Sequence, residues 1–487
     1  MTLKLVSNYV NIQPTTEKNS FDLYDFVSQK GGKVTLNSLK ATENVLVTGA
    51  TGSGKTTSVL LPMFHKLLSN NCSGLVLDVK GELWKMMSLI ANKKDLAHRI
   101  KVIGLNDCAS DFNILNNFTP DIFKSFLRKF SSQSEKNLYW SGMGVNNLLD
   151  LVSLEDELNK IDQKSLEQTQ FVRMFDLLTD PDCSKMIHKR VAELAAREAT
   201  EDSISEDVIA KVCSLFRKIK SDKFHFFNLY VSGSTDQDDL MQLTWRTDEL
   251  VNTISMLKEE SVTTKINSLS DKMRLDDMVF EENQIVILVG DIRRPLLSKN
   301  IASAVRNCFY TQLLSREPED IGGTMPSFLM VDEYQYFVNF TDTADVLSDE
   351  SFSSLSRSFN HINICATQSI ASLYRYAENS SAVDMLLQNF VNKIFLNTDC
   401  KRNYLLAKDI FEFNGESMAD TPVMSLVAQH GAKLGLCKIS TEDGIEFQSF
   451  VPSANPDSML QYCISDRFRS ELLQFNRKRP AIRTCSH

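Results

Sequence analysis

The chain has 487 residues, of which 43% are hydrophobic and 24% are charged, and its formal net charge is −9. At about 100 to 200 residues per domain, this length predicts more than one hydrophobic core, and the composition excludes a wholly disordered or fibrous chain. The acidic balance argues against a surface coated all over with nucleic-acid-binding charge, although it allows a local basic groove or pore.

The apolar runs and the cysteine spacing indicate in which cellular compartment the protein works. No apolar stretch approaches the roughly 18 residues that a membrane span needs, and the start of the chain lacks the apolar core of a signal peptide. The ten cysteines include no C-x-x-C pair, and the seven histidines show no matching ligand spacing. We therefore expect a soluble, intracellular protein with reduced thiols and no zinc site.

The first strong motif follows an apolar run. Before it, a turn signal at Gly31-Gly32 precedes Val34-Thr35-Leu36, where we expect short strands that cover the edge of the main sheet. The run Val45-Leu46-Val47 predicts a buried strand. It leads directly into a complete P-loop, Gly49-Ala50-Thr51-Gly52-Ser53-Gly54-Lys55-Thr56, followed by Thr57.

Each part of a P-loop has a chemical role. The glycines let backbone N–H groups turn inward and cradle phosphates, Lys55 can reach the β and γ phosphates, and the Thr56 hydroxyl can bind Mg²⁺. The helix that should begin near Lys55 adds the positive end of its dipole. We therefore predict a site for a nucleoside triphosphate with Mg²⁺.

Further elements along the chain predict the fold class. A helix should run through Leu68, followed by strands at Gly74 to Asp78 and at Lys101 to Leu105, and this alternation is typical of an α/β unit with a parallel sheet. Strand patterns return late in the chain. They lie at Ile285 to Val289, Ser327 to Val331, Ile362 to Ala366 and Lys393 to Leu396.

The intervening segment has another character. From about 120 to 275, charged and apolar residues recur at helical spacing, which predicts an inserted all-α domain. The patch Phe224 to Phe227 is consistent with either a strand or a buried helical turn. We expect three parts: 1–119, the first part of the nucleotide-binding domain; 120–275, the all-α insert; and 276–487, the second part with a C-terminal tail. From Asp457 this tail should be a loosely held helix or arm, and its run Arg477-Lys478-Arg479 a solvated face rather than a nucleic-acid contact.

Acidic residues at strand ends supply the remaining chemistry. Asp332 and Glu333 follow an apolar strand, so Asp332 can hold Mg²⁺ and Glu333 can orient or deprotonate the attacking water. Asp78 also ends a strand and is a weaker candidate for the metal's carboxylate. Because paired acids suit hydrolysis better than a single one, we place Asp78 and Glu82 in a supporting role.

Gln368 follows the strand that ends near Ala366. A glutamine side chain at a strand's carboxyl end can donate to a phosphate oxygen and accept from water, so Gln368 is a candidate γ-phosphate sensor. Arg357 lies upstream among small polar residues, and alone it is a surface arginine.

Four motifs together resemble a known family. They are Gly49 to Thr57, Leu77-Asp78-Val79-Lys80-Gly81-Glu82, Asp332-Glu333-Tyr334-Gln335 and Ala366-Thr367-Gln368-Ser369. Their order and spacing resemble those of type IV coupling proteins of the TraG/TraD type, over about residues 30 to 450. Trp140 and Asn113-Ile114-Leu115 also resemble family landmarks, although the family usually has Pro where Ile114 stands. Its members usually begin with two membrane-spanning helices, and we expect none in this chain.

The resemblance implies a RecA/FtsK-like hexameric P-loop motor that uses ATP and Mg²⁺, in which Arg357 reaches a neighbour's nucleotide. Such a coupling protein hydrolyses ATP and brings single-stranded DNA with attached protein to a type IV secretion or conjugation channel. Its partners would be a relaxase–DNA complex, a channel or membrane-anchor protein and possible adaptors. Its place would be the cytoplasm, free or peripheral at the inner membrane through a partner.

Two alternatives stay open. One is a coupling ATPase for protein effectors whose helical insert binds adaptors. The other is a nucleotide-bound adaptor that switches shape without hydrolysis. The presence of both Asp332 and Glu333 disfavours the second, because a switch without turnover does not need paired acids.

Overall fold

The structure is a computed structural model. It describes residues 20–28, 30–128, 135–162, 169–197, 206–268, 274–321, 324–340, 347–375, 377, 380–398, 400–413 and 435–478. Arg479 of the basic run lies outside these residues, as does the side chain of Trp140. The chain divides into two compact units. The first comprises Met1–Cys108, Arg274–Ala302 and Arg306–His487, and the second comprises Ala109–Met273 with Ser303–Val305.

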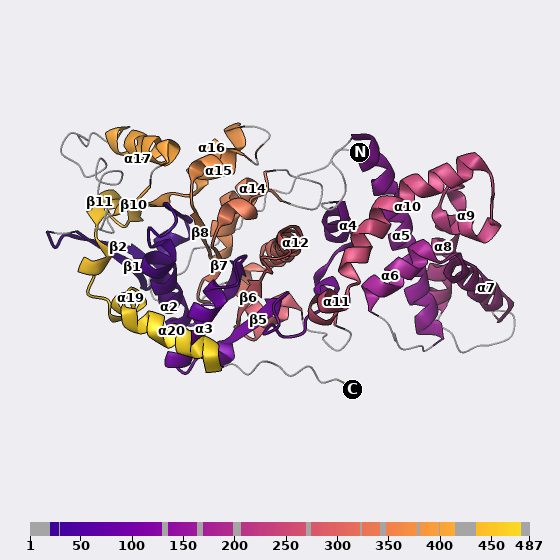
Figure 1. Cartoon of the computed structure of the whole chain (residues 1–487), viewed down its shortest axis with the longest axis horizontal. Coiled ribbons are helices and arrows are strands. Elements are labelled where there is room, and N and C mark those ends of the chain that lie inside the picture. The colour runs from indigo at the N-terminus through magenta and orange to yellow at the C-terminus, as the bar shows by residue number, and fades with distance from the viewer. Residues whose placement is uncertain are drawn as a thin grey trace. The chain divides into compact units, whose positions relative to one another are not determined.

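The first unit is built on a nine-stranded sheet, in the order β11-β10-β9-β3-β8-β7-β4-β6-β5 (Figure 1). Neighbours from β9 to β5 are parallel, whereas β10 is antiparallel to both β9 and β11. The mostly parallel sheet predicted from the sequence is therefore confirmed. The strands are β3 (Val45–Thr48), β4 (Gly74–Asp78), β5 (Ile100–Gly104), β6 (Ile285–Val289), β7 (Ser327–Val331), β8 (His361–Thr367), β9 (Asn392–Leu396), β10 (Gly435–Thr441) and β11 (Gly444–Phe450).

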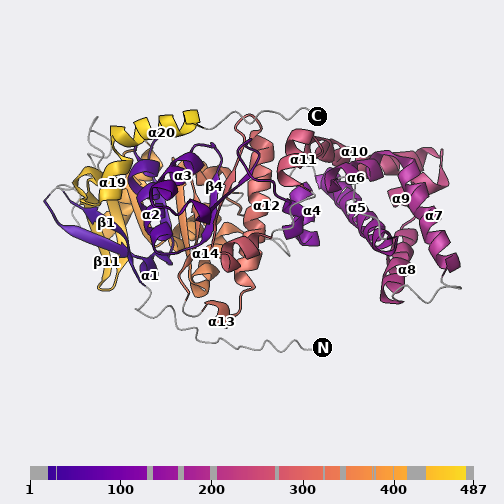
Figure 2. The same ribbon diagram turned by 90° about the horizontal axis from the view of Figure 1, so that it is seen from below.

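Helices cover both faces of this sheet, as buried parallel strands require. One face carries α2 (Leu61–Ser69), α3 (Leu83–Lys93), α19 (Ser458–Cys463) and α20 (Asp466–Lys478), whose apolar side chains join one core cluster with the strands (Figure 2). On the other face, the rings of Phe309 and Phe352 lie 5.5 and 5.7 Å from that of His361 in β8. That face carries α12 (Pro295–Leu314), α14 (Asp349–Leu355), α15 (Ile370–Tyr374), α16 (Ser380–Asn389) and α17 (Lys401–Phe413).

The N-terminal strands form a separate hairpin. β1 (Asp22–Val27) pairs with β2 (Lys33–Asn37) in a two-stranded sheet of their own. The hairpin meets the end of the main sheet through hydrogen bonds to the segment around β11. The Gln448 amide donates to the carbonyls of Phe26 at 2.6 Å and Gly32 at 3.0 Å, and Val451 N–H donates to the Val27 carbonyl at 2.9 Å. Beyond these strands, α1 (Ser38–Ala41) leads into β3, and α13 (Pro318–Ile321) precedes β7.

The C-terminal segment is packed, so the prediction of a loosely held tail is wrong for the part that the structure describes. Leu460 in α19 is 0% exposed and Phe468 in α20 is 2% exposed. Glu471 in α20 forms an ion pair with Lys93 of α3 at 2.7 Å. This packing was not evident from the sequence, because most residues of α20 are charged or polar and only a few apolar positions mark the face that it buries.

The second unit is helical in its described part, with one isolated bridge between Asn113 and Asn267. The patch from Phe224 to Phe227 turns into a helix: His225 caps α9, and its Nδ1 accepts from Phe227 N–H at 3.1 Å. The helices are α4 (Pro120–Arg128), α5 (Glu135–Ile161), α6 (Gln170–Thr179), α7 (Pro181–Arg197), α8 (Glu206–Ser221), α9 (Phe226–Ser232), α10 (Gln237–Leu257) and α11 (Glu260–Ile266). Across all described residues, no helix combines the length and apolarity needed to cross a bilayer.

Candidate nucleotide site

The P-loop leaves the carboxyl end of β3, between β8 and β9 in the sheet. Gly52 and Gly54 adopt φ values of 79° and 96°, in the left-handed region that disfavours side chains. The chain then enters a π-helical turn at Lys55–Leu60 that continues into α2. The predicted order of strand, glycine turn and helix is therefore present, and it directs the helix N-terminus toward the loop.

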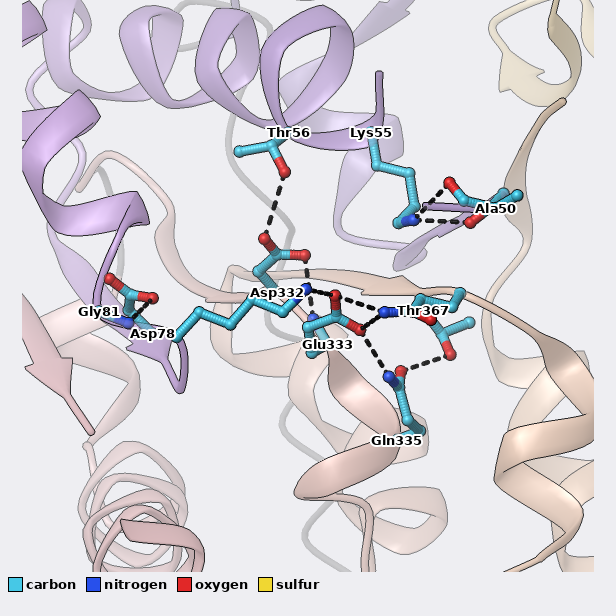
Figure 3. Close-up of polar contacts among 12 residues, drawn as sticks. Ala50, Lys55, Thr56, Asp78, Gly81, Asp332, Glu333, Gln335 and Thr367 are labelled. Carbon is cyan, nitrogen blue, oxygen red and sulfur yellow. Dashed lines mark hydrogen bonds and ion pairs between the residues drawn. The ribbon is translucent and has the colours of Figure 1, made fainter. Parts of the chain in front are cut away.

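Lys55 folds over its own loop (Figure 3). Its ammonium donates to the carbonyls of Gly49 at 2.6 Å and Ala50 at 3.1 Å, and the residue is only 6% exposed. Burial lowers the pKa of Lys55, while the nearby carboxylates of Glu333 and Asp332 act in the opposite direction. The Lys55 amine is thus held by two neutral carbonyl acceptors of its own loop, which are weaker partners than a charged phosphate would be.

Asp332 follows β7 and reaches the P-loop helix. Its Oδ2 accepts from the Thr56 hydroxyl at 3.2 Å, and its Oδ1 accepts from Glu333 N–H at 3.0 Å. Burial and the charge of Glu333 raise its pKa, against the opposing effects of Lys80 and Lys55. A bound cation opposes such a shift, because it favours the charged carboxylate.

The donor set of Thr56 and Asp332 fits Mg²⁺, which prefers oxygen ligands and keeps waters and substrate phosphates in its shell. Within the described ranges, His, Cys, Asp and Glu side chains form no group of three or more that could hold a metal. A metal at this pair would therefore complete its coordination with phosphate and water oxygens.

Glu333 is the most highly connected side chain of the site. Its carboxylate accepts from the Gln368 amide at 2.8 and 2.9 Å and from the Gln335 amide at 2.6 Å, and it forms an ion pair with Lys80. Burial alone raises the pKa of this carboxyl, but these donors outweigh burial and lower it. Glu333 also has a φ of 58°, a conformation that costs of order 1–3 kcal/mol and that surrounding contacts must maintain.

Gln335 extends this network to β8. The Thr367 hydroxyl donates to the Gln335 Oε1 at 2.8 Å. Gln368, which follows Thr367, donates to both oxygens of the same Glu333 carboxylate. The ends of the neighbouring strands β7 and β8 are thus tied together through Glu333.

Asp78 and Glu82 occupy different positions. The Asp78 carboxylate accepts from Gly81 N–H and Trp84 N–H, both at 2.9 Å, so it caps the start of α3. Burial raises its pKa to about 6 against these backbone hydrogen bonds. The Glu82 side chain is 59% exposed and pairs with Lys85. Backbone donors therefore occupy Asp78, and Glu82 faces solvent rather than the P-loop.

Arg357 lies apart from the P-loop of its own chain. It belongs to a 3-10 turn, Ser356–Phe359, just before β8 begins, and its guanidinium contacts Glu43 at 3.2 Å, just before β3 begins. These positions are at the amino ends of the parallel strands, whereas the P-loop lies at the carboxyl ends. The Arg357 side chain is 62% exposed.

Three residues of the network had no role in the sequence-based prediction: Lys80, Gln335 and Thr367. Lys80 and Gln335 stand within the motifs that were recognised, but their function depends on strand order. Because β4 lies next to β7, Lys80 emerges beside Glu333. The available signal was a polar residue at the end of a strand, as Thr367 is in β8, or within four positions beyond it, as Lys80 and Gln335 are.

Comparisons with known proteins agree with this architecture. Residues 25–288 match the family model described as the central domain of helicase HerA. The bacterial conjugative coupling protein TrwB, in an unbound form, is 12% identical, with a TM-score of 0.51 over 88% of this chain and 82% of that chain. TrwB with the GTP analogue GDPNP is also 12% identical, with a TM-score of 0.50 over 86% and 80%. No curated protein sequence matches. At these identities the structural likeness shows the fold alone, and the predicted RecA-like P-loop fold is confirmed.

Proposed function

The chain belongs to the family of the HerA helicase central domain, and we propose that it is an ATP-hydrolysing motor. One observation carries this proposal. Lys55, Thr56, Asp332, Glu333 and Gln368 come from three distant parts of the chain and meet at the carboxyl ends of β3, β7 and β8. Binding and cleavage of a triphosphate require side chains that meet in this way at the strand ends.

Each residue has a role in the proposed reaction. The loop N–H groups and the Lys55 ammonium bind the phosphates, and Thr56 and Asp332 hold Mg²⁺, which when bound neutralises charge on the phosphate oxygens. Glu333 orients the attacking water and accepts its proton. The fold likeness to TrwB, described in complex with a GTP analogue, supports a nucleotide at this place.

The network around Glu333 suggests how Gln368 senses the nucleotide. Lys80, Gln335 and Gln368 together bring two donors to each oxygen of Glu333, which occupies the about four acceptor sites of a carboxylate. Glu333 therefore accepts a proton from water only after a donor leaves. A γ-phosphate oxygen competes for the Gln368 amide. When Gln368 turns to the phosphate, Glu333 becomes free to act, and hydrolysis starts only with the triphosphate in place.

For the biological task, we propose a coupling protein of a type IV secretion or conjugation system that translocates single-stranded DNA with attached protein. The motif resemblance and the fold of the conjugative coupling protein TrwB support this assignment. We propose a homo-hexamer in which Arg357 serves the neighbouring nucleotide, because Arg357 lies at the amino ends of the strands, away from the P-loop of its own chain, so that a role in hydrolysis would require an adjacent subunit. The second candidate is a motor for protein effectors, favoured by the acidic net charge of −9.

The proposed chemistry predicts that Lys55→Ala and Glu333→Gln each lower ATP turnover by about 100-fold or more. Glu333→Gln keeps nucleotide binding, because it leaves the phosphate cradle intact, whereas Lys55→Ala weakens it. Turnover and the affinity for a fluorescent ATP analogue separate the two effects. Glu82→Gln, at an exposed carboxylate outside the network, is the matched control and keeps wild-type turnover. Wild-type turnover in Glu333→Gln would contradict the assignment.

Arg357 is tested by mixing subunits. If it acts on a neighbour, Arg357→Ala subunits lower the activity per wild-type subunit in mixed rings, because each variant leaves one adjacent site without its cation. ATPase assays across a series of mixing ratios measure this dependence. Arg469→Ala, another exposed arginine, in α20, is the control and changes nothing. Activity that simply scales with the wild-type fraction would remove Arg357 from the mechanism.

Single-stranded DNA distinguishes the two motor hypotheses. If DNA is the substrate, it stimulates ATP hydrolysis and promotes ring formation, and raised salt reverses both effects because phosphate contacts release counterions. ATPase rates and the mass of the complex, with and without DNA, provide the measurement. Unchanged turnover and mass with DNA would favour the protein-effector motor.

A further inference from the structure

The first unit contains a second pocket, away from the P-loop. It lies between strands β9 and β10 and helices α15, α16 and α17 and has a volume of about 620 Å³. This volume falls within the range of small-molecule sites. Leu387, Leu405 and Ile410 give it apolar walls, and Lys393 and Lys438 lie on the sheet side.

The two lysines face each other across neighbouring strands. Lys393 in β9 is the direct partner of Lys438 in β10, and like charges at such positions destabilise a sheet. Lys393 is only 5% exposed, and its ammonium donates to the Phe390 carbonyl. Burial and the charge of Lys438 lower the pKa of Lys393 to about 7. An anion between the two amines would relieve this cost.

The acids of the pocket do not neutralise these lysines. Asp384 accepts from the Tyr374 hydroxyl, and the Arg402 guanidinium lies 4.3 Å from the centre of the Tyr374 ring. Asp409 also lines the pocket. Among the described residues, burial and the neighbouring lysine lower the pKa of Lys393, burial lowers that of Lys438, and no carboxylate acts against either shift. The sheet side of the pocket therefore carries two amines with no carboxylate partner in the part of the chain that the structure describes, and a phosphate bound between them would favour their charged forms.

Helix α17 connects this pocket to the nucleotide site. Asn403, in its first turn, is fully buried. Its amide donates to the Thr48 hydroxyl at 2.9 Å and to the Gln368 carbonyl at 3.3 Å, and its Oδ1 accepts from Ile370 N–H at 2.7 Å. Thr48 ends the strand before the P-loop, and Ile370 lines the pocket. One side chain thus contacts the P-loop strand, the Gln368 backbone and the pocket wall.

We propose that this pocket is an effector site for a small organic phosphate with an apolar or aromatic body. The phosphate lies between Lys393 and Lys438, and the body lies against the leucine and isoleucine side chains of α16 and α17. Asn403 transmits occupancy to Gln368 and Thr48, so the ligand changes the affinity for nucleotide. This inference goes beyond the proposed function and does not depend on hydrolysis or on DNA.

Pyridoxal 5′-phosphate is a suitable probe, because it combines an aromatic ring, a phosphate and an aldehyde. A neutral lysine amine attacks the aldehyde carbon and forms an imine with loss of water, and borohydride delivers hydride to the imine carbon to give a stable secondary amine. Peptide mass spectrometry then locates the adduct, with an ATP analogue present to shield Lys55. We expect labelling of Lys393 or Lys438 at least about tenfold above that of exposed lysines such as Lys189, and suppression by phenyl phosphate.

Coupling is measured by the affinity for a fluorescent ATP analogue. Phenyl phosphate should change this affinity at least about twofold in the wild type, and Lys438→Gln should abolish the change while keeping basal affinity. Lys393→Met is the second variant for the same measurement, because the apolar methionine side chain preserves the buried packing of the lysine stem. Labelling no greater than at Lys189, or labelling that phenyl phosphate does not suppress, would overturn the site. Selective labelling with an unchanged nucleotide affinity would overturn the effector role.

Discussion

The hydrogen bond between the Thr56 hydroxyl and the Asp332 carboxylate joins residues that are 276 positions apart. It exists because β3, β8, β7 and β4 are adjacent and parallel, so their carboxyl ends share one edge of the sheet. The contacts between distant segments of the site follow from this alignment. The P-loop follows β3, β7 brings the two acids, β8 brings Gln368, and β4 brings Lys80.

Glu333 shows how the resting arrangement restrains the chemistry. The contacts of Lys80, Gln335 and Gln368 hold this carboxylate in its charged form, with donors on both of its oxygens. The same donors that lower its pKa also make it a weak base until they leave. In the proposed mechanism, hydrolysis is thereby linked to rearrangement of side chains from β4, β7 and β8, and a motor would need such a link between nucleotide state and structure.

The sequence predicted those features that are encoded locally. The P-loop, its strand and helix, and the acids at the end of β7 are short-range patterns with a known chemical use. The roles of Lys80, Gln335 and Asn403 depend on which strands and helices are neighbours, and periodicity does not encode this. Asp78 was a weaker candidate for the metal's carboxylate, and the sequence did not show that its carboxylate caps α3, because a strand-end acid can serve in either way. The packed tail was missed because α20 exposes charged residues over most of its surface and buries few.

The most direct test of the nucleotide site is an experimental structure of the Glu333→Gln variant with ATP and Mg²⁺. The account predicts that the Lys55 ammonium leaves the carbonyls of Gly49 and Ala50 for the β and γ phosphates, with the metal held between the Thr56 hydroxyl and Asp332. A nucleotide bound away from the P-loop, or a metal held by Asp78 with Asp332 turned away, would contradict it.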